Sequence, residues 1–316
     1  MNRKRGNILA LLCFISYFHY SQSQSVIIIQ PGPSEGKDAR VWSLSPNGNF
    51  PDHLYTKANA WTWNGEFGIE RTFIEFDLSP VTKNMIISEV LLSFYYHSLP
   101  GNPEQTNAGD NRILISRTIE SWSENSITWD NQPETTNLHQ VEVPPSSFPQ
   151  QNCTDIDVTS LIDDALNYNE NYFSFLVRIK DEMTYRRFAQ ASSDHLTPEK
   201  RPKLEIFYDC FVDLGNDTTI CSSDTINLSA GPYFSEYLWS TGNTDSITEI
   251  SSNGIFWVQV VDDFGCIASD SIQIYFLPDP ATILNLGPDT IICTGDSILL
   301  NPESDFQIFY GRMIDG

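Results

Sequence analysis

Apolar and polar residues alternate with a period of two through most of this 316-residue chain. Successive side chains of an extended strand point to opposite faces, so such a segment has one apolar face and one polar face. Clear examples begin at Thr72, Val90, Phe173 and Leu204. Clusters of Pro, Gly and Asn, such as residues 46–49, separate these segments. The pattern predicts an all-β chain whose strands stack into β-sandwiches.

One short helix interrupts the strand pattern. Five apolar residues share a face at helical spacing, namely Val158, Leu161, Ile162, Ala165 and Leu166. Asp157 precedes them, and we expect its carboxylate to cap the helix.

A fifteen-residue segment recurs 72 residues further along the chain. Residues 214–228 and 286–300 are identical at nine of the fifteen positions. Repetition at such a period is typical of tandem small domains. The second copy reaches only Gly316, so we expect a longer parent protein. The predicted sandwich units are residues 25–208, residues 212–277 and a truncated repeat at 285–316.

The first 24 residues have the layout of a secretory signal peptide. Residues 2–5 are basic, residues 8–18 form an apolar run, and residues 21–25 are small and polar. The apolar run is shorter than the roughly 20 residues that a membrane-spanning helix needs. We therefore predict export to the cell surface or the extracellular space, with no transmembrane segment in the mature chain.

Cysteine usage supports an exported protein stabilised by disulfides. Six cysteines are present, and loss of Cys13 with the leader leaves five. Cys221 and Cys266 lie inside the complete repeat, so we predict that they pair. Cys153 and Cys210 are then left for each other. The odd cysteine opens the second copy of the repeat, and its partner would lie beyond the end of this sequence.

Charge excludes one class of partner. The formal net charge is −23, and residues 209–316 contain 16 acidic residues against the single base Arg312. A surface of this kind repels phosphate backbones, so we expect no nucleic-acid binding. Acidic residues in turn-rich edges also suit calcium, which prefers oxygen ligands. Asp38, Asp77 and Asp194 are the candidate ligands, although no contiguous calcium loop is present.

The N-terminal part of the chain resembles a known family. The matching blocks are residues 30–33, 36–39, 71–79, 122–129, 133, 157–159 and 201–206. In this order they resemble the DNRLRE domain, also called disaggregatase-related or carbohydrate-binding module family 96. The resemblance covers about residues 25–208 and implies a jelly-roll β-sandwich that binds a polysaccharide, with acidic polysaccharides such as alginate among the ligands. It also implies that Trp122 and Trp129 are structural.

The unit that follows has a second resemblance. Several residues are similar to the PKD/Ig-like repeats of exported proteins from Bacteroidota-type bacteria, namely 214–217 with Cys221, 237–242, Gly254 with 257–258, and 265–266. The implied fold is a small Ig-like sandwich that acts as a spacer.

Aromatic and cationic residues supply the candidate sugar contacts. Sugar rings stack their C–H faces on aromatic rings, and arginine binds carboxylates bidentately. Trp61 and Trp63 share a parity in a stretch rich in Gly and Asn that we do not expect to be a regular strand. The full candidate set is Tyr55, Trp61, Trp63, Arg71, Tyr185, Arg186, Arg187 and Lys200.

Catalytic motifs are missing from this sequence. It contains no HExxH, GxSxG, Walker or CxxC pattern. We therefore predict a non-catalytic, polysaccharide-binding exported protein. Two alternatives fit the same residues: a structural or adhesive surface protein without glycan binding, and the accessory front end of a polysaccharide-degrading enzyme whose catalytic domain is missing.

Overall fold

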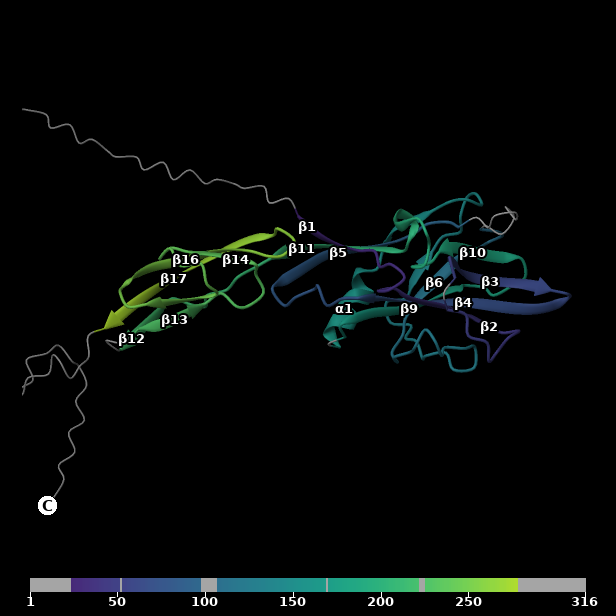
Figure 1. Ribbon diagram of the computed structural model, residues 1–316, viewed down its shortest axis with the longest axis horizontal. Helices are drawn as coiled ribbons and strands as arrows, with labels where there is room; N and C mark the ends of the chain where they lie inside the picture. The colour runs from purple at the N-terminus through teal and green to yellow at the C-terminus, as the bar shows by residue number, and fades with distance from the viewer. Residues whose placement is uncertain (1–23, 52, 98–106, 169, 222–224, 278–316) are drawn as a thin grey trace, which may run out of the picture.

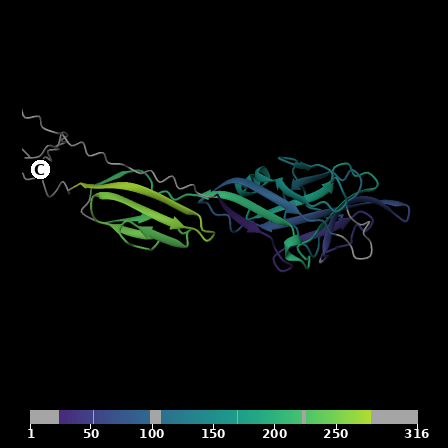
Figure 2. The same ribbon diagram turned by 90° about the horizontal axis from the view of Figure 1, so that it is seen from above.

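The computed structural model consists almost entirely of β-strands, which confirms the all-β prediction. Its strands form four sheets in two units, and Figures 1 and 2 show these units arranged end to end. Residues 1–23 of the predicted signal peptide and the second copy of the repeat lie outside the described residues. The structure describes residues 24–51, 53–97, 107–168, 170–221 and 225–277. Within them, no helix has the length and apolar character needed to span a membrane.

Two sheets form the N-terminal unit. The first sheet has the order β1 (Ser25–Ile29), β11 (Lys203–Cys210), β5 (Met85–Phe94) and β8 (Cys153–Asp157). The second has the order β10 (Arg186–Ala191), β3 (Tyr55–Trp63), β4 (Glu66–Asp77), β9 (Tyr172–Ile179), β6 (Ile113–Arg117) and β7 (Val141–Val143). Strand β2 (Lys37–Trp42) also pairs with β4.

The main core lies between these two sheets. Ile74 and Phe76 of β4 face it, as their alternation with acidic residues predicts. The ring of Phe175 lies 6.2 Å from that of Phe76 and 4.7 Å from that of Phe173, measured between centroids. Burying each of these side chains contributes roughly 1.5–3 kcal/mol to folding.

The predicted helix is present as α1 (Thr159–Asn167), which buries Leu161, Ile162 and Ala165. Val158 occupies the N-cap position and has no capping side chain. The carboxylate of Asp157 instead accepts a hydrogen bond from the Thr159 N–H at 3.0 Å. This carboxylate also accepts a hydrogen bond from the Thr159 hydroxyl, and the two bonds lower the pKa of Asp157.

A smaller core covers the opposite face of β4. It contains Phe73 together with residues of β2 and the loop that follows β6. Trp122 and Trp129 pack against this cluster, and Trp122 Nε1 donates a hydrogen bond to Ser174 Oγ at 2.7 Å. Both tryptophans therefore support the sandwich, as the family resemblance implies.

The C-terminal unit has two further sheets. One has the order β12 (Thr218–Cys221), β17 (Ile267–Leu277), β16 (Gly254–Val261) and β14 (Glu236–Trp239), and the other pairs β13 (Ile226–Ser229) with β15 (Ile247–Ile250). Strands β12 to β15 are each four residues long, which is too short for a clear alternation, whereas β16 and β17 are longer.

The two units are joined covalently at the turn between β16 and β17. Cys210, the last residue of β11, forms a disulfide with Cys266. Beside it, the Tyr208 hydroxyl donates a hydrogen bond of 2.6 Å to Asp262 Oδ2. Asp262 Oδ1 accepts the backbone N–H of Phe264 and of Cys266, which fixes the turn at residues 262–265. The turn of the second unit is thereby attached to the last strand of the first.

The predicted pairing of Cys221 with Cys266 is wrong, because the two residues lie at opposite ends of β17. Cys221 pairs with Leu277 in the sheet, whereas Cys266 immediately precedes β17. Eleven strand residues separate these ends by about 35 Å, and a disulfide needs Cα atoms within about 7 Å.

The predicted pairing of Cys153 with Cys210 is also wrong. Strand β5 places Cys153 opposite Phe94 and Cys210 opposite Met85, at its two ends. Cys153 is a free thiol.

Disulfide mapping tests this junction. We expect a Cys210–Cys266 cross-linked peptide in a non-reducing digest. We also expect the Cys210→Ser/Cys266→Ser variant to lose up to about 4 kcal/mol of unfolding free energy, because the cross-link no longer restricts the unfolded chain. Denaturant unfolding measures the loss, with Cys153→Ser as the control that removes a thiol and no cross-link. A Cys221–Cys266 peptide would contradict this topology.

Candidate functional site

Strand β3 places three of the candidate aromatic residues in one row. Tyr55, Trp61 and Trp63 are half-buried and have the same parity on this strand. The stretch is a regular strand that forms a hairpin with β4, so the prediction of irregular structure there was wrong. The alternation was obscured because Ala58 and Ala60, on the other parity, are small.

A buried carboxylate lies beside this row. Glu70 of β4 is 3% exposed and receives hydrogen bonds from Arg40 Nη1 at 2.7 Å and from Asn59 Nδ2 at 2.7 Å. Lys57 Nζ lies 3.3 Å from the same carboxylate. Arg187 Nε donates to Asn59 Oδ1 at 3.4 Å. We call Arg40, Lys57, Asn59, Glu70 and Arg187 the cationic cluster.

Positive charge exceeds negative charge in this cluster. Burial lowers the pKa of Lys57, Glu70 offsets that effect, and the neighbouring guanidinium groups of Arg40 and Arg187 add to it. Burial also lowers the pKa of Arg187, again against the attraction of Glu70. Three cations surround one carboxylate, so the cluster has a formal charge of +2 in a chain of net charge −23.

Each cation of the cluster lies over an aromatic ring. The guanidinium carbon of Arg187 is 4.4 Å from the centroid of Trp61, and that of Arg40 is 5.1 Å from Phe50. Lys57 Nζ lies 5.4 Å from the centroid of the Tyr55 ring. Such cation–π contacts contribute about 0.5–2 kcal/mol each, more when they are shielded from water.

Further rings extend the row. Trp42 lies between Trp63 and Phe50, at centroid distances of 5.3 Å and 6.3 Å. Tyr185 contacts Trp61 edge-on at 5.1 Å, and His97 stacks on Tyr55 at 5.1 Å. Aromatic surface therefore borders the cationic cluster along β3.

Two hydrogen-bond donors beside Glu70 lack partners. Arg40 Nε and Trp42 Nε1 are buried and make no hydrogen bond within the described part of the chain. A buried donor without a partner costs about 1–3 kcal/mol, so a bound acceptor would be stabilising at this position.

The other candidate cations point elsewhere. Arg71 follows Glu70 on β4 and faces the opposite side, where it binds Glu182 through two hydrogen bonds of 2.8 and 2.9 Å. Arg186 lies 3.3 Å from Asp181 and belongs to the opposite face from Arg187. Lys200, in the short 3-10 helix Pro198–Lys200, lies 5.1 Å from the ring of Tyr96.

Sequence reasoning missed Arg40, Lys57, Asn59, Glu70 and Trp42. Lys57 and Asn59 alternate with the two alanines, which is a weak strand signal because alanine is small. No signal along the chain places Arg40 beside Glu70, since that contact depends on the pairing of β2 with β4.

The predicted calcium ligands do not converge. Asp77 is exposed, and its carboxylate accepts a hydrogen bond from the Ser79 N–H. Asp38 is opposite Ile74, which is three residues before Asp77 on β4, so about 10 Å of strand separates Asp38 from Asp77. Asp194 lies near enough to Asp38 to raise the pKa of that carboxyl. Among the described residues, the one trio with ligand atoms within 4.8 Å is Cys210, Asp262 and Cys266, whose cysteines form the disulfide. Calcium binding stays a prediction.

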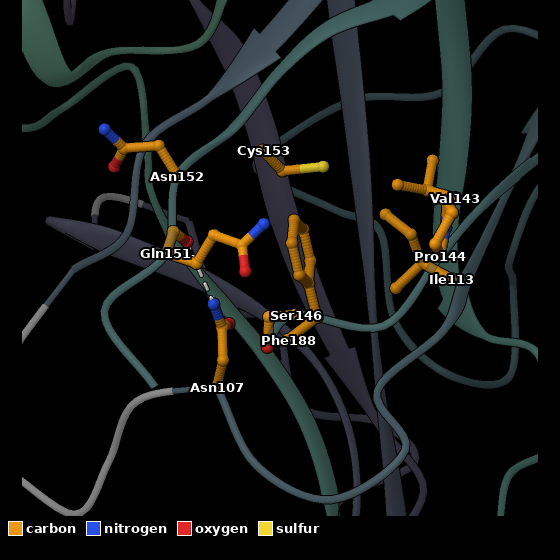
Figure 3. Close-up of a pocket in the computed structure, with 9 residues that line it drawn as sticks. All are labelled: Asn107, Ile113, Val143, Pro144, Ser146, Gln151, Asn152, Cys153 and Phe188. Atoms are coloured by element: carbon orange, nitrogen blue, oxygen red, sulfur yellow. Dashed lines mark hydrogen bonds between the residues drawn. The ribbon is translucent and has the colours of Figure 1, made fainter. Parts of the chain in front are cut away.

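A small cavity of about 20 Å³ lies at another place in the first unit, beside Phe188 (Figure 3). Asn107, which bonds to the carbonyl of Gln151 at 3.1 Å, borders one side, and Ile113 borders the other. The Cys153 thiol reaches this cavity, and burial raises its pKa to about 11. A thiol with this pKa is almost fully protonated at neutral pH, which makes it a poor nucleophile.

Comparison with known proteins gives the family. The model of carbohydrate-binding module family 96 matches residues 35–208, more than half of the chain. The chain belongs to carbohydrate-binding module family 96. The cationic cluster lies within the family 96 region, as does the aromatic row of β3.

Other comparisons add little. No curated protein matches the chain. A solved structure described as the β-glucuronidase from Ruminococcus gnavus in complex with N1-substituted uronic isofagomine aligns at 10% identity with a TM-score of 0.23. The alignment covers 81% of this chain and 47% of that one, so the chain spans about half the length of that protein. A similarity this low does not bear on function.

The charge balance of the cluster can be tested through stability. Glu70→Gln removes the one carboxylate and leaves buried cations without a counter-ion, so we expect a loss of about 3–5 kcal/mol in unfolding free energy. Glu75→Gln is the matched control on the same strand, because its pair with Lys37 is more exposed and should be worth about 1 kcal/mol or less. Equal losses in denaturant unfolding would contradict the role given to Glu70.

The buried Asp38 carboxyl predicts a dependence of stability on pH. Asp38 is 3% exposed, and burial raises its pKa to about 7. The unfolded chain loses this proton near pH 4 and the folded chain only near pH 7. The free energy of unfolding is therefore unaffected by ionisation of Asp38 below pH 4. It falls by up to roughly 4 kcal/mol as the pH rises from 4 to 7, because the folded chain retains the proton that the unfolded chain releases.

Asp38→Asn keeps an acceptor for the Ser193 N–H and removes the charge. We expect this variant to lose the Asp38 part of the pH slope in urea unfolding with EDTA, and to be more stable than wild type at pH 8. Identical slopes would contradict the prediction. Adding millimolar Ca²⁺ tests the metal prediction, since a ligand role requires stabilisation of wild type and not of the variant.

Proposed function

We propose that this protein is exported and non-catalytic, and that its N-terminal DNRLRE-type jelly roll binds an acidic polysaccharide at the cationic cluster. The C-terminal unit acts as a PKD/Ig-like spacer in a larger surface or secreted protein. Membership of carbohydrate-binding module family 96 supports a carbohydrate ligand. The charge of the cluster supports an acidic one.

The observation on which this proposal rests is the set of three cations held over aromatic rings. In a chain of net charge −23, long-range attraction of a polyanion is unfavourable, so local positive charge has to supply it. Arg40, Lys57 and Arg187 provide that charge, and Glu70 neutralises only part of it. Arginine matches the two oxygens of a uronate carboxylate.

Aromatic rings supply the second half of a sugar site. Tyr55, Trp61 and Trp63 are each partly exposed. Stacking a sugar C–H face on such rings removes apolar surface from water, and nearby polar groups fix the orientation. The unpartnered donors Arg40 Nε and Trp42 Nε1 suit sugar hydroxyl or carboxylate oxygens.

The chemistry of the cluster favours binding over catalysis. A general acid or base must exchange a proton with its substrate. Glu70 accepts hydrogen bonds from Arg40 and Asn59 and lies 3.3 Å from Lys57 Nζ, so protein donors already occupy its oxygens. The buried Cys153 thiol lies at a separate cavity.

Binding to soluble polyuronates tests the proposal. Affinity electrophoresis in alginate or polygalacturonate gels should retard the wild-type chain, and the retardation should weaken as salt increases. Arg187→Gln and Trp61→Ala should each weaken binding by about tenfold or more, because each removes a charge-assisted or stacking contact. Thermal unfolding establishes that each variant is folded.

Two neighbouring arginines are the controls. Arg186→Gln and Arg71→Gln remove one positive charge each from the opposite faces of β10 and β4, so binding should stay within about twofold of wild type. If these controls weaken binding as much as Arg187→Gln, general charge and not the cluster attracts the ligand. If wild type is not retarded by either polyuronate, the structural or adhesive alternative is favoured.

A further inference from the structure

The C-terminal unit exposes a set of large apolar side chains on one face of its four-stranded sheet. Strand β16 alternates between Val258 and Val260, which are fully buried, and Ile255 and Trp257, which are 65% and 42% exposed. Packing in the core explains why Val258 and Val260 are apolar, but it does not explain why Ile255 and Trp257 are apolar. A second role is needed for the outward pair, since a solvent-facing strand position ordinarily holds a polar residue.

Strand register joins these residues to two others. Leu238 of β14 is opposite Gln259, so it is a diagonal neighbour of Trp257. Ile255 is opposite Gln273, so Tyr275 of β17 is its diagonal neighbour. Diagonal neighbours lie about 7–8 Å apart, within reach of large side chains. We call Leu238, Trp257, Ile255 and Tyr275 the outer stripe, which crosses three strands.

Neutral polar side chains accompany every member of the outer stripe. The residues directly opposite Leu238, Trp257, Ile255 and Tyr275 are Gln259, Ser271, Gln273 and Thr219. The amide of Gln273 also donates to the Tyr275 hydroxyl. Amides and hydroxyls can both donate and accept hydrogen bonds, as sugar hydroxyls do.

Charge decides which partner fits this face. Residues 209–277 contain ten Asp and Glu and no Lys or Arg, so a polyuronate or a second copy of the same unit would be repelled. A basic protein would need several carboxylates beside the stripe, and Glu236, which shares the exposed face of β14 with Leu238, is set against four neutral residues directly opposite the stripe. Apolar rings flanked by neutral amides and hydroxyls instead suit an uncharged sugar chain.

We propose that the outer stripe binds an uncharged polysaccharide, with Trp257 and Tyr275 stacking on sugar rings and with Gln259 and Gln273 hydrogen-bonding to hydroxyls. The unit then acts as a second binding module as well as a spacer. This site shares no residue with the cationic cluster, so either site can exist without the other.

Pull-down of the full chain on microcrystalline cellulose and on insoluble chitin, with affinity electrophoresis in mixed-linkage β-glucan, tests the proposal. Wild type should bind at least one of these neutral probes, and binding should change less than about twofold between 0.05 and 0.5 M NaCl because no ion pair is involved. Trp257→Ala should weaken binding about tenfold or more. Tyr275→Ala should also weaken it.

Phe264→Ala is the matched control, because Phe264 is 44% exposed in the β16–β17 turn, outside the outer stripe. It should bind like wild type, and so should Arg187→Gln. The proposal is overturned if wild type binds none of the three probes. It is also overturned if Trp257→Ala binds as well as wild type. Dimerisation in sedimentation velocity that Trp257→Ala abolishes also overturns it, since the stripe would then contact a second copy.

Discussion

Strand β4 is hydrogen-bonded on both edges and covered on both faces, and the candidate site depends on this arrangement. Its even-numbered residues place Ile74 and Phe76 in the main core, and its odd-numbered residues place Phe73 in the smaller one. Strands β2 and β9 pair with the same stretch of β4, so they must occupy opposite edges. A strand fixed on four sides holds Glu70 at one position, and the cations assemble around it.

The cationic cluster shows how positive charge is kept in an acidic protein. Removing three cations from water is costly, and the Glu70 carboxylate offsets only part of that cost. The rings of Phe50, Tyr55 and Trp61 supply the remaining contacts, each through the negative face of its π-system. A ligand carboxylate would offset part of the remaining positive charge. The same aromatic rings would thereby position the cations and contact the sugar.

The junction between the two units has a separate origin. Asp262 bonds to the backbone of its own turn and to the Tyr208 hydroxyl of the first unit, next to the Cys210–Cys266 disulfide. A turn that the repeat already required has thus become the attachment point of the repeat to the sandwich. If both proposed sites bind, this junction sets the distance between a charged and an uncharged sugar contact.

The sequence by itself determined the all-β class and the short helix, because both follow from local periodicity, and its family resemblance implied that Trp122 and Trp129 are structural. It also identified Trp61, Trp63 and Arg187 as candidates. Only the tertiary structure decided which cysteines meet and that Arg40 and Glu70 are in contact. Strand pairing brings together residues far apart in the chain, and strand direction decides which end of β17 a cysteine occupies. Adjacent residues such as Arg186 and Arg187 are equivalent in composition, yet the two-residue period of a strand sends them to opposite faces.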